Sequence, residues 1–168
     1  QLAKEGRIIR AVAGDINEGP VSAARANVME AELEDVISVR LCDGLDGVLP
    51  TEADDIVIAG MGGELIWQII ERTPWLRDEE KLLILQPMTF AAHLRRMLWE
   101  NGFRILTEKA VREGSRVYTV LSASYDGEKR QVSDADCVLG LLGDCPEDRD
   151  YLKRELRRIR EKCKGCEH

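Results

Sequence analysis

The sequence has no apolar run that approaches the ~18 residues of a membrane-spanning helix, so it predicts no membrane segment. A signal-like start is also lacking, because the first six residues, QLAKEG, are polar. The five cysteines are an odd set at low density, which excludes a disulfide scaffold and favours a reducing, cytoplasmic setting. With 44% hydrophobic and 33% charged residues, the 168-residue chain is predicted to be soluble and globular, with a sizeable core.

Metal-ligand patterns are scarce as well. Cys163 and Cys166 form a lone C-x-x-C pair, with no second pair and no histidine at zinc-ligand spacing. No strand precedes the pair, as one would in a redox motif. His93 falls in a predicted amphipathic helix, where surface or packing roles are expected, and the terminal His168 is given no role. We therefore expect no metal.

The net charge of −7 argues against a generally basic nucleic-acid binder, but the charge is unevenly distributed. Residues 149–164 hold eight Lys or Arg against three Asp or Glu, a local charge of +5, so the remainder carries −12. A basic segment on an acidic body suggests an anionic partner at one end. From charge alone, a solvated helix face is the more common explanation.

Apolar strand-like runs alternate with helix-like stretches along most of the chain. Strands are predicted at residues 7–13, 36–41, 55–59, 81–85, 103–109 and 117–125, and helices at 21–33, 63–72 and from Thr89 as a cap to about residue 100. Strand–helix alternation predicts an α/β fold, with a mostly parallel sheet and helices on both faces. The last two strands leave no room for a helix between them and are expected to form an antiparallel edge hairpin.

Beyond this region the chain changes character. Residues 126–136 are polar and are interpreted as a linker. Leu152, Leu156, Ile159 and Cys163 then recur at heptad-type spacing, over too short a length for a coiled-coil assignment. The predicted organisation is a Rossmann-like domain over residues 1–126 and a C-terminal basic helical segment over residues 137–168.

The most informative stretch is DDIVIAGMGGELI, residues 54–66. A short apolar strand, expected to be covered on both faces, enters a turn with three glycines in four positions and a helix follows at once. Glycines allow positive φ and close approach of the backbone to a ligand. A turn of this kind at the carboxyl end of a parallel strand is where open α/β sheets bind ligands, although a tight turn without a ligand is the alternative.

Three other strand ends carry polar or small residues. Asp15 follows the first strand, where a carboxylate can accept hydrogen bonds from two ribose hydroxyls. Asp43 and Gly44 follow the second, where an acceptor could bind an adenine amino group and glycine leaves room for the ring. Gln86 and Pro87 follow the fourth. Singly these are weak signals, but parallel strands bring such ends to one edge.

Dinucleotide-binding folds and S-adenosylmethionine-dependent methyltransferases share this plan. The closing antiparallel hairpin favours the methyltransferase sheet, and no complete G-x-G-x-x-G is present. The segments GDINEGP (14–20), DGL (43–45), IAGMGG (58–63) and LILQP (83–87), with Asn101-Gly102-Phe103 and Tyr118, resemble the bacterial tRNA (adenine-N1)-methyltransferases of the TrmK type, which methylate adenine 22 of tRNA. The resemblance runs from about residue 7 to 125.

This resemblance implies roles for particular residues. S-adenosyl-L-methionine would be the cofactor, bound by Asp15, Ile16, Asp43, Gly44, Ala59, Gly60, Met61 and Gly63. Methyl donor and target base would meet at Gly60, Met61 and Gly62, with Gln86 and Pro87 bordering the target pocket. The family's C-terminal helical hairpin, implicated in tRNA binding, is similar to the basic segment, where Lys153, Arg154, Arg157, Arg158 and Arg160 are the RNA-binding candidates.

The sequence departs from the family pattern in two places. Met88 stands where the family's Gln-Pro-Asn motif has Asn, which removes an amide that could orient a base. The family's first strand and its glycine-containing cofactor loop have no counterpart, and residues 1–6 resemble the end of the helix that follows that loop. The sequence is accordingly expected to lack a central strand, to expose unpaired strand edges and to bind the donor weakly.

The predicted activity is methyl transfer to N1 of an adenine in tRNA. A methyltransferase of the same fold acting on a small molecule or protein is the first alternative, and it predicts no role for residues 149–164. A non-catalytic RNA-binding module is the second. A dinucleotide-dependent oxidoreductase is least favoured, because no residue set resembles a proton relay.

Overall fold

The structure is a computed structural model that describes residues 1–165, apart from the side chains at positions 162 and 165. Cys166 and His168 lie outside the described residues, so the second half of the C-x-x-C pair has no structural account. The chain divides into two compact units, and each is described by itself. Unit 1 comprises Gln1–Asp54 with Arg72–Leu76, and unit 2 comprises Asp55–Glu71 with Arg77–His168.

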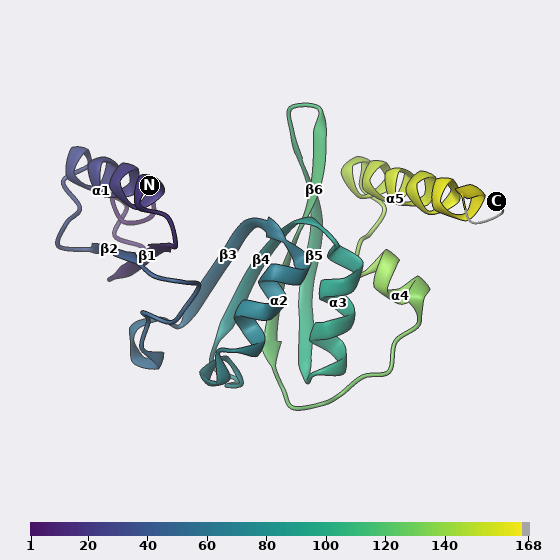
Figure 1. The fold of residues 1–168 in the computed structure, drawn as a ribbon, viewed down its shortest axis with the longest axis horizontal. Helices are drawn as coiled ribbons and strands as arrows, with labels where there is room; N and C mark the ends of the chain where they lie inside the picture. Colours follow the sequence, from purple (N-terminus) through teal and green to yellow (C-terminus); the bar gives the residue numbers. More distant parts are fainter. Residues whose placement is uncertain (166–168) are drawn as a thin grey trace. The chain divides into compact units, whose positions relative to one another are not determined.

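Unit 1 contains two parallel strands joined by a helix. β1 (Ala11–Asp15) pairs with β2 (Ile37–Leu41), and α1 (Glu18–Glu30) connects them, as Figure 1 shows. The predicted strand–helix–strand order is confirmed, but β1 begins four residues later than expected and extends to Asp15. Two short 3₁₀ turns, η1 (Pro50–Glu52) and η2 (Pro74–Leu76), complete this unit.

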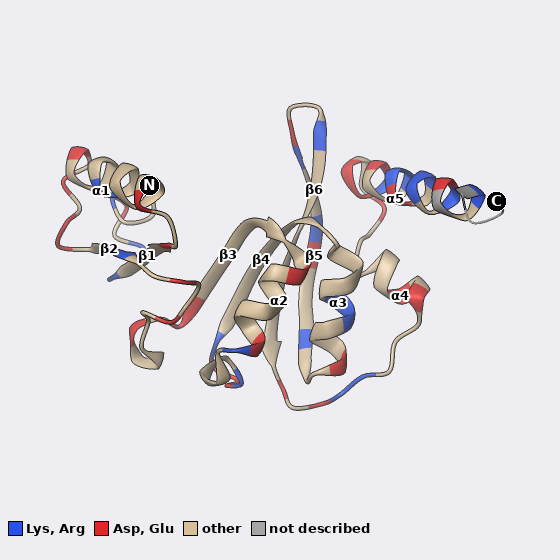
Figure 2. Ribbon diagram, viewed as in Figure 1, with Lys and Arg blue, Asp and Glu red and all other residues tan. Residues whose placement is uncertain are grey.

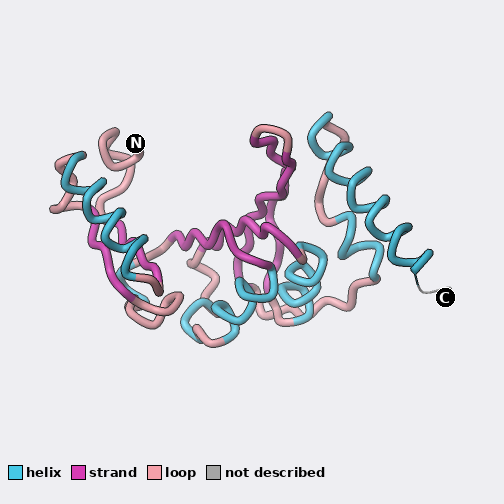
Figure 3. The backbone as a smooth tube through the Cα atoms, turned by 45° about the horizontal axis from the view of Figure 1, so that its top comes forward, coloured by secondary structure: helices cyan, strands magenta, loops and turns pink. Residues whose placement is uncertain are grey.

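Unit 2 is built on a four-stranded sheet in the order β3-β4-β6-β5. β3 (Asp55–Gly62) and β4 (Leu82–Thr89) are parallel, whereas β6 (Arg116–Tyr125) is antiparallel both to β4 and to β5 (Phe103–Glu113). The predicted edge hairpin is therefore confirmed, and β6 is its inner strand. The tip of this hairpin extends beyond the rest of the sheet in both Figure 1 and Figure 3.

Both long helices of the central part of unit 2 cover the same face of its sheet. α2 (Gly63–Glu71) packs on β3 and β4, and α3 (Ala91–Glu100) packs on β4 and β5 (Figure 1). The buried core between these layers includes Ile56, Ile58, Ile66, Leu83, Leu85, Leu94, Leu98, Phe103 and Leu121. Val57 points the other way and is 66% exposed, so coverage of this strand on both faces is not observed.

The polar stretch interpreted as a linker leads into a helix that the sequence analysis missed. α4 (Asp134–Leu139) begins in a capping box, in which the Ser133 hydroxyl accepts from the Asp136 backbone N–H and the Asp136 carboxylate accepts from the Ser133 N–H. α4 is short and begins with charged residues, so apolar periodicity could not reveal it.

The basic segment forms one long helix, α5 (Pro146–Gly165), which packs against β5 and β6. Tyr151 is buried with Ala110 and Val117 of the hairpin, and Leu152 packs against this cluster. Further along α5, Leu156 is 47% exposed and Ile159 is 39% exposed. The predicted heptad seam therefore makes packing contacts only near its start.

Candidate functional site

The ends of β1 and β2 meet at one edge of unit 1. Asp15 pairs with Leu41 in the strand register, and the Cys42 N–H donates to the Asp15 carbonyl oxygen at 3.0 Å. One Asp15 carboxylate oxygen accepts from the Asn17 backbone N–H at 2.8 Å, and Ile16 between them is 61% exposed. The other oxygen receives no hydrogen bond from the described residues, so it can accept one from a ligand.

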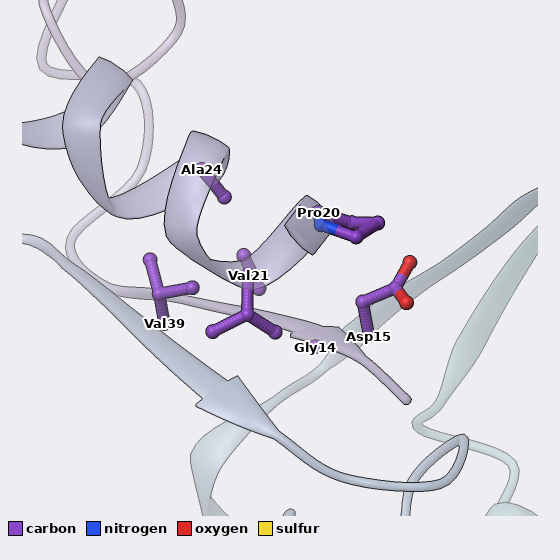
Figure 4. A pocket seen from close by; sticks show the side chains of 7 residues that line it. Gly14, Asp15, Pro20, Val21, Ala24 and Val39 are labelled. Carbon is purple, nitrogen blue, oxygen red and sulfur yellow. The ribbon is translucent and has the colours of Figure 1, made fainter. Parts of the chain in front are cut away.

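A small pocket lies beside Asp15, between the strands of unit 1 and α1. Its volume is about 200 Å³, and it is lined by Ala13, Gly14, Asp15, Pro20, Val21, Ala24 and Val39 (Figure 4). Ligand pockets commonly reach several hundred Å³, so this one could hold only part of a nucleoside. A side chain at position 14 would place its Cβ 2.8 Å from the Cys42 sulfur, so the Cys42 side chain would have to shift to make room for it.

Asp43, the second predicted cofactor contact, is already bound to an arginine. Arg72 donates from its two terminal nitrogens to the two Asp43 carboxylate oxygens, at 2.9 and 2.5 Å. This pairing holds the pKa of Asp43 below its ordinary value and raises that of Arg72. Gly44 follows with φ +59°, a conformation that favours glycine. Arg72 could not be predicted as a partner of Asp43, because a basic residue just after a helix carries no distinctive signal.

The ends of β3 and β4 meet at one edge of unit 2 and bring together the residues predicted for methyl transfer. Ala59 pairs with Gln86 and Met61 with Pro87, and the register is irregular on both sides of Met61. The Gly60 N–H donates to the Gln86 side-chain oxygen at 2.9 Å. Gly60 has φ +78°, so the glycine turn does adopt a conformation that other residues rarely take.

The other end of the Gln86 amide faces the residue that replaces the family's asparagine. Its nitrogen lies 3.6 Å from the Met88 sulfur, which is a weak acceptor. Met88 is 39% exposed and presents a flexible apolar side chain at this edge. Gln86 is thus fixed through its oxygen, while its amide nitrogen retains donor capacity.

A close backbone contact joins the glycine turn to the residue after β4. A Cβ added to Gly63 would lie 2.5 Å from the Phe90 carbonyl oxygen, and one added to Gly62 would lie 3.2 Å from the Thr89 hydroxyl. Phe90, and not Thr89 as predicted, precedes α3, and its backbone is left-handed with φ +56°. Thr89 instead continues β4, opposite Gly62.

The five residues of α5 predicted to bind RNA differ in how far they are engaged with the rest of the protein. Acidic and basic residues both occur along α5, and basic residues, blue in Figure 2, predominate from its second turn onward. Arg154 donates to the Val117 carbonyl oxygen, and its guanidinium lies 4.9 Å from the Tyr151 ring centroid. Arg158 lies over the Phe90 ring. Lys153, Arg157 and Arg160 are exposed and project from the helix.

A buried ion pair anchors the C-terminal helices to the sheet. Arg95 of α3 donates to both carboxylate oxygens of Glu108 on β5, and also to the carbonyl oxygens of Cys137 and Val138 in α4. Burial is the largest single influence and alone would lower the pKa of Arg95, but the charge and hydrogen bonds of Glu108, together with Tyr151, leave that pKa raised. This pair could not be predicted from the sequence, because charged residues in amphipathic elements are normally exposed.

Residues 1–165 contain no cluster of three or more metal-binding side chains. No helix in that same range is long and apolar enough to cross a bilayer.

Comparisons with known proteins give concordant matches. A family model described as a methyltransferase domain matches residues 1–121. The tRNA (adenine(22)-N(1))-methyltransferase of Bacillus subtilis is 39% identical over 124 residues, which cover 70% of this chain and 52% of that protein. The chain therefore spans about half the length of this curated relative.

Solved structures agree with the sequence matches. A Streptococcus pneumoniae candidate tRNA (m1A22) methyltransferase, in complex with S-adenosyl-L-methionine, is 31% identical with a TM-score of 0.85, over 96% of this chain and 76% of that one. The Bacillus subtilis m1A22 tRNA methyltransferase TrmK is 27% identical with a TM-score of 0.74, over 95% of this chain and 82% of that one.

These matches confirm the resemblance and the fold class inferred from the sequence. The strand order of unit 2, with an antiparallel β6 next to β4, is that of a Rossmann-like methyltransferase sheet. The family match covers 121 of the 168 residues and includes every predicted strand-end residue. The chain belongs to the methyltransferase domain family.

Proposed function

We propose that this protein transfers a methyl group from S-adenosyl-L-methionine to N1 of an adenine in tRNA, in the cytoplasm. The observation that carries the proposal is the hydrogen bond from the Gly60 N–H to Gln86, which holds the glycine turn against the Gln-Pro segment at the strand ends. Two proteins to which the chain is similar are tRNA m1A22 methyltransferases. The described residues of each unit support a different part of this assignment.

In unit 1, the residues fit the ribose of a nucleoside donor. Asp15 has an unused carboxylate oxygen beside a pocket that would accommodate a sugar ring. Asp43 is fixed by Arg72, but each carboxylate oxygen can accept more than one hydrogen bond, so an adenine amino group could still bind there. Ile16 and Gly44 would supply apolar and backbone contacts next to these carboxylates.

In unit 2, the residues fit the reacting groups. When bound, the sulfonium of the donor supplies an electrophilic methyl group. Adenine N1 carries a free lone pair and no proton at neutral pH, so the protein need not supply a general base. Its task is to align the base and exclude water, and such positioning can contribute about 7–11 kcal/mol.

The glycine turn is suited to that task. The backbone carbonyls of residues 60–62 could accept hydrogen bonds from the exocyclic amine of adenine, while Ala59, Met61 and Gly63 approach the donor. Gln86 and Pro87 would border the base on the β4 side. Since N1 takes part in Watson–Crick pairing, the target adenine must be unpaired or flipped out, at a cost of a few kcal/mol. Contacts of α5 with the tRNA backbone would offset this cost.

The test is methyl transfer to tRNA, followed by digestion and mass analysis for 1-methyladenosine. The wild-type protein should form this nucleoside, and Asp15→Ala should weaken binding of S-adenosylhomocysteine in calorimetric titration. Asp35→Ala, at an exposed turn position outside the proposed site, is the matched control. Donor binding without tRNA methylation would favour a small-molecule or protein substrate, whereas tRNA binding without donor binding would favour a non-catalytic RNA module.

A further inference from the structure

Phe90 occupies an unusual backbone conformation at the edge that carries the proposed methyl-transfer residues. Its φ of +56° and ψ of +34° lie in the left-handed region, which a bulky residue rarely adopts. Two contacts hold it there: its carbonyl oxygen accepts from the Leu94 N–H at 3.1 Å, and that same oxygen lies against Gly63. Strain of this kind persists where the surroundings enforce it, and it is concentrated at functional sites.

The result of this conformation is an exposed aromatic ring. Phe90 is 43% exposed, whereas Phe103, the other phenylalanine of the chain, is 1% exposed and lies in the core. Phe90 directly follows Thr89, which pairs with Gly62. The Phe90 backbone therefore lies next to the glycine turn, and its ring is not buried by the helix that it precedes.

A basic side chain from the C-terminal helix lies over this ring. The guanidinium carbon of Arg158 is 5.9 Å from the Phe90 ring centroid, near the outer limit of a cation–π contact. Arg158 has one other described partner, Glu155, at 3.5 Å, and its side chain is 43% exposed. It is therefore weakly held in this position.

The distance from the Arg158 guanidinium to the Phe90 ring is shorter than a nucleobase between them would need. Two successive contacts between flat groups need about 7 Å, at about 3.5 Å for each layer. Arg158 would have to move outward by about 1 Å for a base to fit between its guanidinium and the Phe90 ring, and its weak attachment permits that. Aromatic rings and arginine planes are the groups on which proteins stack unpaired RNA bases.

We propose that Phe90 and Arg158 form a stacking subsite for an unpaired nucleobase of the tRNA, next to the methyl-transfer residues. The subsite rests on the proposed function for the identity of the RNA. Phe90 holds the base in place from the turn after β4, and Arg158 covers it from α5. The basic helix thus contributes a side chain at the catalytic edge in addition to contacts with phosphates.

The experiment compares tRNA affinity among variants of these two residues. Phe90→Leu keeps an apolar side chain but removes the stacking face, and it should weaken binding of an unmodified tRNA transcript at least about fivefold. Phe90→Trp should retain affinity within about threefold, because it restores the stacking face. Arg158→Ala should weaken binding, and its effect should be smaller in the Phe90→Leu background. Equal affinity of Phe90→Leu and wild type would overturn the proposal.

Two further measurements separate stacking from structural support and from the proposed function. Transcripts with 2-aminopurine at or beside the target adenine should change fluorescence on binding wild type and Phe90→Trp but not Phe90→Leu. Arg104→Ala, an exposed arginine at the opposite edge of the sheet, is the charge-matched control and should bind like wild type. A fluorescence change that persists in Phe90→Leu would reject the subsite. Failure of wild type to form 1-methyladenosine, with binding that still depends on Phe90, would reject the proposed function and leave the subsite standing.

Discussion

The guanidinium of Arg95 and the carboxylate of Glu108 form an ion pair from which water is almost completely excluded. Their side chains are 1% and 0% exposed, and the shortest of their three hydrogen bonds is 2.6 Å. Thr119 also donates to the carboxylate, as does the Leu141 N–H at 3.0 Å. Every buried side-chain N or O atom among the described residues has a hydrogen-bond partner, so these charges are fully compensated.

Removal of one partner should be strongly destabilising. Glu108→Ala leaves a buried, uncompensated guanidinium, and we expect the free energy of unfolding to fall by about 3–5 kcal/mol. The double variant Arg95→Met with Glu108→Leu should lower the free energy of unfolding much less, because both charges are removed together. Urea denaturation of the three proteins measures this difference. Arg96→Ala is the matched control, since Arg96 pairs at the surface with Glu100 and Asp134, and its loss should have only a small effect.

The same pair bears on how the C-terminal helices attach to the sheet. Arg95 also binds two carbonyl oxygens of α4, so Glu108→Ala should loosen α4 and α5 before the sheet unfolds. Hydrogen exchange would show faster exchange in residues 134–160 of the variant than in β3 and β4. Equal exchange in both regions would contradict a local anchoring role.

The positions of the strands and of the glycine turn could be predicted because each produces a recognisable residue pattern in a single sequence. Buried strands produce apolar runs, and glycines next to such a run indicate a sharp turn. Boundaries were less accurate: β3 was expected to end at Ala59 but continues to Gly62, since pairing with β4 extends into the turn. Apolar periodicity does not report where hydrogen bonding between strands stops.

The features that were missed depend on contacts between residues distant in sequence. Arg95, Glu108 and Arg154 looked like surface residues, yet each is fixed by a partner on another element. A helix capped by Thr89 would include Phe90, but Phe90 lies outside α3 in a left-handed conformation, close to Gly63. Residue spacing contains no information about such approaches.

Acid stability should depend on Glu52 in unit 1. The Arg40 guanidinium donates to both oxygens of this carboxylate, the Leu49 N–H donates as well, and together they lower the pKa of Glu52 to about 2. A carboxyl group with a lowered pKa in the folded state stabilises the fold above its unfolded pKa of about 4.3. That contribution is lost as the pH falls from about 4.3 through about 2.

The variant that tests this is Glu52→Gln. It should lower the melting temperature at pH 7, and the difference from wild type should shrink as the pH is lowered through this window. Thermal melts between pH 7 and 2 would measure it. Glu34→Gln, an exposed glutamate for which no ion pair is described, should follow the wild-type curve. A constant difference between Glu52→Gln and wild type at all pH values would exclude this linkage.

Side chains added to the glycine turn should affect activity according to the room available. Gly63→Ala places a Cβ 2.5 Å from the Phe90 carbonyl oxygen, so the glycine turn and the backbone at Phe90 must move apart, and both stability and methyl transfer should fall. Gly62→Val adds bulk where the base and donor are proposed to meet, so it should block turnover more than it affects the melting temperature. Gly19→Ala is the control, because no atom lies within 4 Å of the added Cβ in α1 and the fold should be unaffected or slightly stabilised. If Gly62→Val turned over substrate at the wild-type rate, the glycine turn would not be part of the proposed site.

The basic face of α5 should determine how tRNA binding depends on salt. Lys153, Arg157 and Arg160 are exposed, whereas Arg154 is engaged with Val117 and Tyr151. Each lost phosphate contact lowers the slope of log K against log salt by about 0.7–0.9, so reversal of the three exposed residues to Glu should flatten it by about 2–3. Arg154→Ala should instead lower the melting temperature and change the slope little. An unchanged slope in the triple variant would show that this face is only solvated, and the affinity would then have to come from other surfaces of the protein.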